Sequence, residues 1–227
     1  MPIQKSKTGL MNTIIRVAQS TRPYIPFVVI NTVKRDMDRQ GRSVLDVGCG
    51  DGLMGGMLKN KKILSIGADI DIKSLKKGYE NATHDGYIMC DVRNLPLQQK
   101  SFDTVLAIEV LEHQEKADAL KTIKTWEQIA RRQVIITTPV GECRVAAKKD
   151  NPFDEHKSFW YPEEMKRQGY TIRGHGLAKM YGDDGWFARA PKIIQPLLYV
   201  LAITVGPVVY FLPGLSGRMV CIKRLDG

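Results

Sequence analysis

The hydrophobic and polar positions of this chain alternate between strand-like and helix-like patterns. Short apolar runs predict buried strands at Ser43–Val47, 63–68, 87–90, 104–108 and 134–137. Apolar residues at helical spacing predict helices at 53–60, at 72–79 and after Glu112. Strands that alternate with helices every 20–30 residues are typical of a parallel sheet with helices on both faces. In such a sheet, ligands bind near the carboxyl ends of the strands.

The two ends of the chain flank this alternating core. Residues 10–40 have helical spacing interrupted by Pro23 and Pro26, which predicts two short helices, the second over 27–39. No internal repeat or low-complexity linker divides the chain. We therefore expect one domain over 1–227, with N-terminal helices at 1–40, a Rossmann-like core at 41–176, an apolar helical insertion at 177–217 and a last strand at 218–227.

Composition and net charge exclude some classes of protein but do not identify the function. Of the 227 residues, 43% are hydrophobic and 26% charged, which is ordinary for a globular domain and argues against a mostly disordered chain. The net charge of +10 suits an anionic partner, either nucleic acid or an acidic membrane surface, and a solvated basic face explains it equally well.

The cysteines argue against a metal or disulfide framework. There are four, with no C-x-x-C pair and no histidine at ligand spacing, so no metal is expected and a reducing compartment is indicated. The N-terminus has no uninterrupted apolar stretch, so we expect no signal peptide.

A glycine turn follows the first predicted strand. Gly48 and Gly50 let the backbone adopt positive φ and approach a ligand closely. Dinucleotide-binding enzymes use a related turn, G-x-G-x-x-G, but here the spacing is G-x-G-x-G and Asp46 lies in the strand before it. A carboxylate there disfavours a pyrophosphate and favours a ligand with a cationic amine, such as the methionine part of S-adenosylmethionine.

Two further acids end the second and third predicted strands. Asp69 is placed to accept hydrogen bonds from ribose hydroxyls, and its alternative role is a helix N-cap, which Asp71 could also provide. Asp91 is placed to accept from the exocyclic amine of adenine, with the Val92 N–H meeting a ring nitrogen; its alternative role is a turn or cap. Three acids in order, one at each successive strand end, are far more specific evidence for such a ligand than any one of them alone.

The segments VLDVGCGDG, IGADID, CDVRNLPL and SFDTVLAIEVLEH together resemble the class I S-adenosylmethionine-dependent methyltransferases, in the group similar to the ubiquinone and menaquinone methyltransferases. The resemblance covers roughly 40–140, with a weaker pattern at 156–174. It implies a doubly wound, mostly parallel seven-stranded sheet that ends in an antiparallel pair, for which 170–174 and 218–224 are suited. The resemblance does not indicate which atom of the substrate, carbon, oxygen, nitrogen or sulfur, accepts the methyl group. It implies S-adenosylmethionine as cofactor, with contacts at Asp46, Gly48, Gly50, Asp69, Asp91 and Val92, and with Glu109 and Val110 lining the site.

Methyl transfer from a sulfonium needs alignment and exclusion of water, and needs a base only if the acceptor loses a proton. The candidate bases are Glu112, His113 and His156. Glu112 and His113 could instead cap the next helix, and His156 could lie in an ordinary surface loop. His84 and His175 are expected to be structural or incidental. The position after the fourth strand lacks the Asn/Asp-Pro-Pro-aromatic run of base N-methyltransferases, which argues against that chemistry and leaves other RNA chemistry open.

Residues 193–212 contain no charge and are long enough to span a bilayer. If the strands before and after them share one sheet, a single span is excluded. Pro207 after Gly206 should kink or end a helix. Arg189, Lys192 and Arg218 at the base are placed to meet anionic headgroups. The sequence therefore predicts a helical hairpin, or two short helices, dipping into one leaflet. The alternatives are a lid over an apolar acceptor and an oligomer interface.

We therefore expect a cytoplasmic methyltransferase, peripheral on the membrane, that acts on a hydrophobic or lipid-linked small molecule and not on nucleic acid. The alternatives are a soluble small-molecule or RNA methyltransferase and a catalytically silent, cofactor-binding partner protein.

Overall fold

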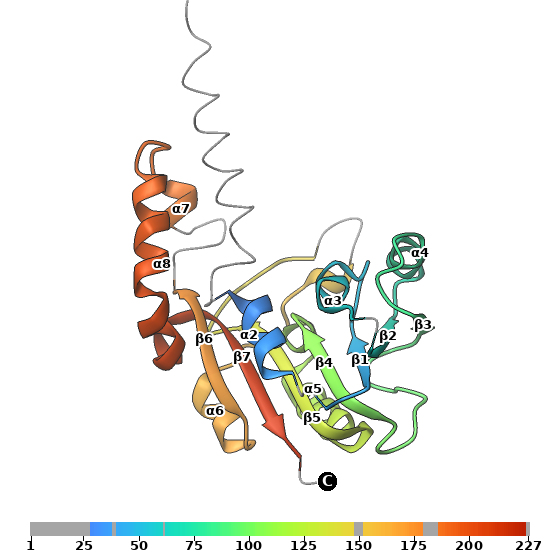
Figure 1. Ribbon diagram of the computed structural model, residues 1–227. Coiled ribbons are helices and arrows are strands. Elements are labelled where there is room, and N and C mark those ends of the chain that lie inside the picture. Colours follow the sequence, from blue (N-terminus) through green and yellow to red (C-terminus); the bar gives the residue numbers. More distant parts are fainter. Residues whose placement is uncertain (1–27, 38–39, 61, 148–151, 179–185, 226–227) are drawn as a thin grey trace, which may run out of the picture.

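The computed structural model describes residues 28–37, 40–60, 62–147, 152–178 and 186–225. Its centre is one seven-stranded sheet with the strand order β3-β2-β1-β4-β5-β7-β6 (Figure 1). The strands are β1 Ser43–Val47, β2 Leu64–Asp69, β3 Gly86–Met89, β4 Phe102–Ile108, β5 Ala130–Pro139, β6 Thr171–Leu177 and β7 Ser216–Arg224. The predicted fold class is confirmed.

The sheet is parallel except for β7, which pairs antiparallel with both β5 and β6. β1 lies between β2 and β4, and Val47 near its end pairs with Ala68 on one side and Ala107 on the other. The carboxyl ends of these strands therefore lie together at one edge of the sheet. That edge holds the glycine turn and most of the predicted site residues.

Helices cover both faces of the sheet (Figure 1). On one face, Leu45 and Val47 of β1 pack in a buried cluster with Ile123 and Trp126 of α5. On the other face, Val44 packs in a second cluster that includes residues of α2 and β4. The helices are α2 Val29–Asp36, α3 Leu53–Leu58, α4 Ile72–Glu80, α5 Lys116–Ile129, α6 Pro162–Arg167, α7 Trp186–Arg189 and α8 Gln195–Phe211, with short 3-10 turns at η2 Leu111–His113, η3 Pro152–Asp154 and η4 Pro213–Leu215.

The N-terminal prediction is tested only in part. The helix expected over 27–39 is present as the shorter α2. The helix expected before it lies outside the described residues.

The apolar insertion differs from the prediction. Residues 195–211 form one 17-residue helix, α8, and not a hairpin or two short helices. Pro207 lies inside this helix, where its ring removes one backbone donor while the helix continues to Phe211. Within the described part of the chain, no helix combines the length and apolarity needed to cross a bilayer.

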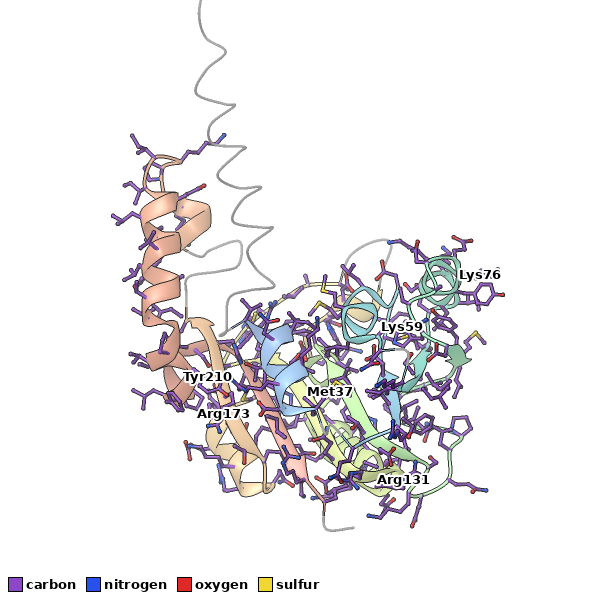
Figure 2. The ribbon with its side chains drawn as sticks, viewed as in Figure 1. Met37, Lys59, Lys76, Arg131, Arg173 and Tyr210 are labelled. Carbon is purple, nitrogen blue, oxygen red and sulfur yellow. The ribbon has the colours of Figure 1, made fainter. Side chains whose placement is uncertain are left out.

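The C-terminal turns of α8 are held against β6 at one close contact. A Cβ added at Gly174 of β6 would collide with the carbonyl oxygen of Val209 and lie 2.9 Å from Cα of Pro213. Next to it, Tyr210 is buried, and the guanidinium groups of Arg35 and Arg173 each lie 5.2 Å from its ring centre. Figure 2 shows Arg173 and Tyr210 at this junction. The N-terminal half of α8, with α7, extends away from the sheet (Figure 1).

We predict that Gly174→Ala destabilises the fold by about 1–3 kcal/mol, because the new methyl group overpacks a backbone contact. Urea denaturation measures the change. Gly214→Ala is the matched control, since a Cβ there has no heavy atom within 4 Å and should change stability by less than about 0.5 kcal/mol. Equal losses in the two variants would show that the contact does not hold α8.

Candidate active site

The glycine turn between β1 and α3 is built from three residues with positive φ. The angles are 66° at Gly48, 53° at Gly50 and 73° at Gly52, a region that glycine adopts without steric cost. The N–H groups of Gly48 and Cys49 both donate to the carbonyl oxygen of Ala68 at the end of β2, at 2.7 and 3.1 Å. The turn is thereby fixed to the neighbouring strand.

Gly50 and Asp69 provide the features that a nucleoside ligand needs. A Cβ at Gly50 would meet no heavy atom within 4 Å, so the backbone here borders open space. The Asp69 carboxylate accepts from the Gly50 N–H at 2.7 Å and from the Asp71 N–H at 2.8 Å, one on each oxygen. Each oxygen keeps a lone pair, which a ribose hydroxyl can use. These residues therefore fit the adenosine part of S-adenosylmethionine.

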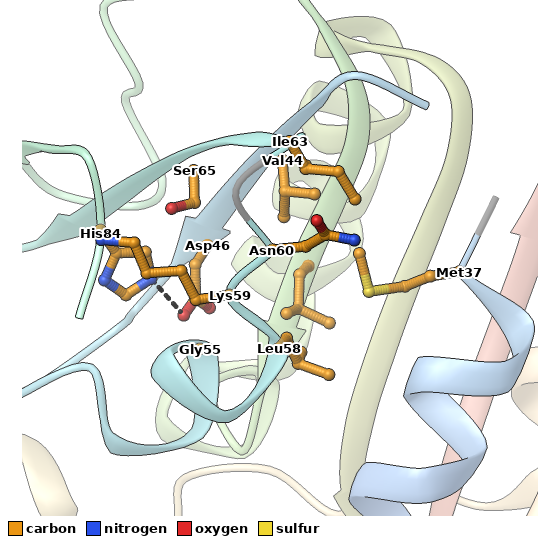
Figure 3. A pocket seen from close by; sticks show the side chains of 11 residues that line it. Met37, Val44, Asp46, Gly55, Leu58, Lys59, Asn60, Ile63, Ser65 and His84 are labelled. Atoms are coloured by element: carbon orange, nitrogen blue, oxygen red, sulfur yellow. Dashed lines mark hydrogen bonds and ion pairs between the residues drawn. The ribbon is translucent and has the colours of Figure 1, made fainter. Parts of the chain in front are cut away.

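Asp46 lies on the other side of the turn, under α3. Its Oδ2 is 3.1 Å from Nε2 of buried His84, as the dashed line in Figure 3 shows. Burial raises the pKa of Asp46, and the hydrogen bond from His84 opposes that rise. Gly55 of α3 packs against both side chains, and a Cβ there would collide with them. The space that these residues share with Met37 and Leu58 is about 20 Å³, room for about one water molecule.

The role of Asp46 toward the cofactor therefore stays a prediction. The structure shows a buried Asp46–His84 pair that packs against Gly55 of α3. This packing agrees with a structural role for His84.

Asp91, two residues after the end of β3, is paired with Arg93, which was not among the predicted site residues. Arg93 donates from Nε to both carboxylate oxygens at 2.9 Å, and its backbone N–H donates to Oδ1 at 2.9 Å. The guanidinium holds the pKa of Asp91 below its usual range. The Val92 carbonyl accepts from Nε1 of Trp126, which fixes this loop to α5. The spacing of Asp91 and Arg93, two residues apart in a loop, is the feature of the sequence that indicates this ion pair.

Glu109, just after β4, is held in a strained backbone conformation. Its φ is 54°, which costs a non-glycine residue about 1–3 kcal/mol. Three contacts compensate: its N–H donates to the Thr137 carbonyl at 3.0 Å, its Oε1 accepts from the Thr137 hydroxyl at 3.0 Å, and its Oε2 lies 2.9 Å from Nε of Arg218. Arg218 is thus paired with Glu109 at this site, whereas the sequence predicted that it meets anionic headgroups.

Glu112, in η2, is buried with its carboxylate turned inward. The Thr138 hydroxyl donates to its Oε2 at 3.1 Å. Burial raises its pKa to about 8, and the nearby charge of Glu109 adds to the rise. Its backbone carbonyl accepts from the N–H groups of Lys157 and Ser158, at 2.8 and 3.1 Å. These two bonds bring the loop after β5 onto η2.

The loop places His156 beside His113, with ring centres 5.0 Å apart. Nδ1 of His113 lies 3.1 Å from the Glu155 carbonyl oxygen, and Nδ1 of His156 lies 2.7 Å from that of Cys143. Burial lowers the pKa of His113. The three candidate bases, Glu112, His113 and His156, therefore form one cluster although 43 residues separate the two histidines.

The cluster and the glycine turn meet through Val110. A Cβ at Gly48 would lie within 3 Å of the methyl groups of Val110, so only glycine permits this approach. Val110 lies two residues before Glu112. The cofactor-binding candidates and the base candidates thus share one edge of the sheet.

We predict that Asp69→Asn weakens binding of S-adenosylhomocysteine by roughly 1–3 kcal/mol, because a charged acceptor is lost. Isothermal titration calorimetry measures the affinity. Asp71→Asn is the matched control: it removes a charge two residues away but keeps a side chain able to cap α4, and should leave the affinity unchanged. An Asp69 variant with wild-type affinity would contradict the ribose assignment.

Comparisons with known proteins agree with this geometry. Residues 45–136 match the family described as a methyltransferase domain. A ubiquinone biosynthesis O-methyltransferase from Paracidovorax citrulli (strain AAC00-1) is 38% identical over 80 residues. That match covers 33% of this chain and 34% of the relative, so the chain spans about a third of the relative's length.

Solved structures share the fold over nearly the whole chain. Magnesium protoporphyrin IX methyltransferase from Synechocystis PCC 6803, with bound S-adenosylmethionine, aligns with a TM-score of 0.53 at 17% identity and covers 100% of this chain and 86% of its own. An S-adenosylmethionine-dependent methyltransferase from Archaeoglobus fulgidus aligns with a TM-score of 0.54 at 18% identity, over 97% and 100% of the two chains. Residues 45–136, which include the glycine turn and the acidic strand ends, therefore match a methyltransferase domain, and the fold is that of S-adenosylmethionine-dependent methyltransferases.

Proposed function

We propose that this chain transfers a methyl group from S-adenosylmethionine to a hydrophobic or lipid-linked small molecule at a membrane surface. The observation that carries the second half of this proposal is the exposed apolar face of α8. S-adenosylmethionine supplies a methyl group already activated by a sulfonium charge. The chain's own task is to align the acceptor and to exclude water.

The exposed apolar side chains of α8 form a stripe along one face of the helix, with exposed Thr204 within it. Leu197 and Phe211 are 68% and 67% exposed, and residues 200, 201 and 208 between them are exposed and apolar. The spacing of three, four or seven residues puts them on one face of the helix. Ile193 before the helix and Leu212 and Leu215 after it are also exposed.

The charge around this stripe suits an anionic interface. Arg189 and Lys192 precede α8, and from Trp186 to Ser216 they are the only charged residues in the sequence. Half-burying a Leu, Val or Phe side chain in an apolar medium gains roughly 1 kcal/mol, so the stripe offers roughly 5 kcal/mol before ordering costs. Basic residues near an anionic surface add about 1 kcal/mol each. Together, the free energies from apolar burial and from the two basic residues are sufficient for reversible membrane binding.

The relative whose name assigns it to ubiquinone biosynthesis supports an apolar acceptor of a quinone type. A hydroxyl acceptor must lose a proton, and Glu112, His113 and His156 are the groups placed to assist. Burial raises the pKa of Glu112 to about 8 and lowers the pKa of His113, so His113 is better suited than Glu112 to accept that proton near neutral pH.

We predict that the protein sediments with vesicles of phosphatidylcholine and phosphatidylglycerol, and that the double variant Leu197→Ser/Phe211→Ser binds them at least about tenfold more weakly, because two apolar contacts are lost. The control is Tyr79→Ser/Met89→Ser, which removes apolar side chains of similar exposure, 74% and 63%, at the opposite edge of the sheet. Equal binding by both variants, or a wild-type protein that stays in the supernatant, contradicts membrane contact.

We further predict that the protein converts S-adenosylmethionine to S-adenosylhomocysteine when it is given the organic-solvent extract of a cell lysate. The acceptor should survive nuclease treatment and leave the aqueous phase on extraction. An acceptor destroyed by nuclease would favour RNA. Cofactor binding without turnover in any fraction would favour a catalytically silent protein.

A further inference from the structure

The imidazole of His84 lies among three glycines next to the cofactor turn. A Cβ at Gly55 of α3 would be 2.5 Å from its Nε2, one at Gly52 of the turn 3.1 Å from its Cε1, and one at Gly67 of β2 3.2 Å from its Nδ1. A methyl group at any of these positions would press on the ring. Three separate segments therefore lack a side chain where this one ring packs.

The neighbours of the two ring nitrogens define which nitrogen carries the proton. Nε2 lies 3.1 Å from Oδ2 of Asp46, as Figure 3 shows, and Nδ1 lies 3.2 Å from the Thr83 hydroxyl. An ionised carboxylate can only accept, so Nε2 donates to Asp46, and Nδ1 of the neutral ring can accept from Thr83. The backbone N–H of His84 donates to the Tyr87 hydroxyl at 2.9 Å. These bonds fix the orientation of the ring.

The bond from His84 uses only one oxygen of Asp46. Among the residues that the structure describes, no hydrogen bond reaches the other oxygen. Burial raises the pKa of Asp46, and the bond from His84 opposes that rise, so the imidazole favours the ionised carboxylate. Asp46 lies two residues before Gly48, the first glycine of the turn. The pair therefore holds a negative charge next to the cofactor turn.

We propose that His84 is a positioning residue for S-adenosylmethionine. It holds one oxygen of Asp46, so that the other stays available to the cationic amine of the cofactor's methionine part. The identity of the cofactor is the part of this inference that rests on the proposed methyl transfer. The sequence predicted a structural or incidental role for His84, because 38 residues separate it from Asp46. A side chain that only fills space would need no donor directed at a carboxylate.

Two amide variants separate the donor from the space that the ring fills. The side-chain amide of glutamine reaches about as far as Nε2 of histidine, whereas that of asparagine reaches only about as far as Nδ1. His84→Gln therefore keeps a donor for Asp46, and His84→Asn loses it. In calorimetry with S-adenosylhomocysteine, we expect His84→Gln to bind within about threefold of the wild type and His84→Asn at least about tenfold more weakly. Equal affinities of the two variants overturn the proposal.

A double-mutant cycle tests whether His84 acts through Asp46. Asp46→Asn should itself weaken S-adenosylhomocysteine binding, because it removes the charge. In that background, His84→Asn should change the affinity by less than about twofold, because the group on which His84 acts is already lost. Additive losses would show that His84 affects the site by another route, and they contradict a positioning role.

Tyr87→Phe controls for general loosening of the loop before β3. It removes the hydroxyl that bonds the backbone of His84 and lies 3.0 Å from the Thr83 hydroxyl, but it leaves the bond to Asp46 in place. Its Tm should fall, while its affinity for S-adenosylhomocysteine stays within about twofold of the wild type. If Tyr87→Phe binds as weakly as His84→Asn, the effect is one of loop stability and the proposal fails.

The wild type separates this inference from the proposed function. A wild-type protein that does not bind S-adenosylhomocysteine rejects the proposed methyl transfer, and the positioning role with it. Wild-type binding that His84→Asn retains in full rejects the positioning role alone. Circular dichroism checks that each variant is folded. If His84→Asn is unfolded, His84→Gln decides, because a folded His84→Gln that binds at least about tenfold more weakly than the wild type overturns the proposal.

Discussion

The contact between Gly48 and Val110 sets the distance between the two functional parts of this molecule. The absence of a side chain at Gly48 lets Val110 approach the turn after β1, and this brings η2 against the cofactor edge. The parallel pairing of β1 with β4 supplies the framework for that approach. The His156 loop then depends on η2, since it is held there by the carbonyl of Glu112. One missing methyl group thus permits the arrangement of cofactor turn, buried acid and histidine loop.

The sheet was predictable because its signals are local. Apolar runs give the strands, and the resemblance supplied the antiparallel end that β6 and β7 form. The position of Asp69 at the end of β2, next to the glycine turn, was also predictable, because an apolar run precedes it in the sequence. The partners of Asp46 and Glu109 were not, because His84 and Arg218 come from distant segments and only the folded chain brings them together.

For the apolar insertion, the local sequence signal was strong but the prediction from it was wrong. Gly206 and Pro207 carry a strong local signal for a helix end, but tertiary packing outweighs it. Val209 and Tyr210, just after the proline, are buried, and Val209 packs closely on Gly174 of β6, which fixes the last turn of α8. Proline removes one backbone hydrogen bond from the helix. The packing that follows it compensates for this loss, so α8 continues to Phe211.

The left-handed backbone at Glu109 has a consequence for how this protein can change over evolution. Glycine at this position would release the backbone strain, but it would lose the side-chain contacts with Thr137 and Arg218 that compensate for it. Such a replacement would also free Arg218 and remove a negative charge from beside Glu112. Backbone strain and site electrostatics therefore act in opposite directions at this residue.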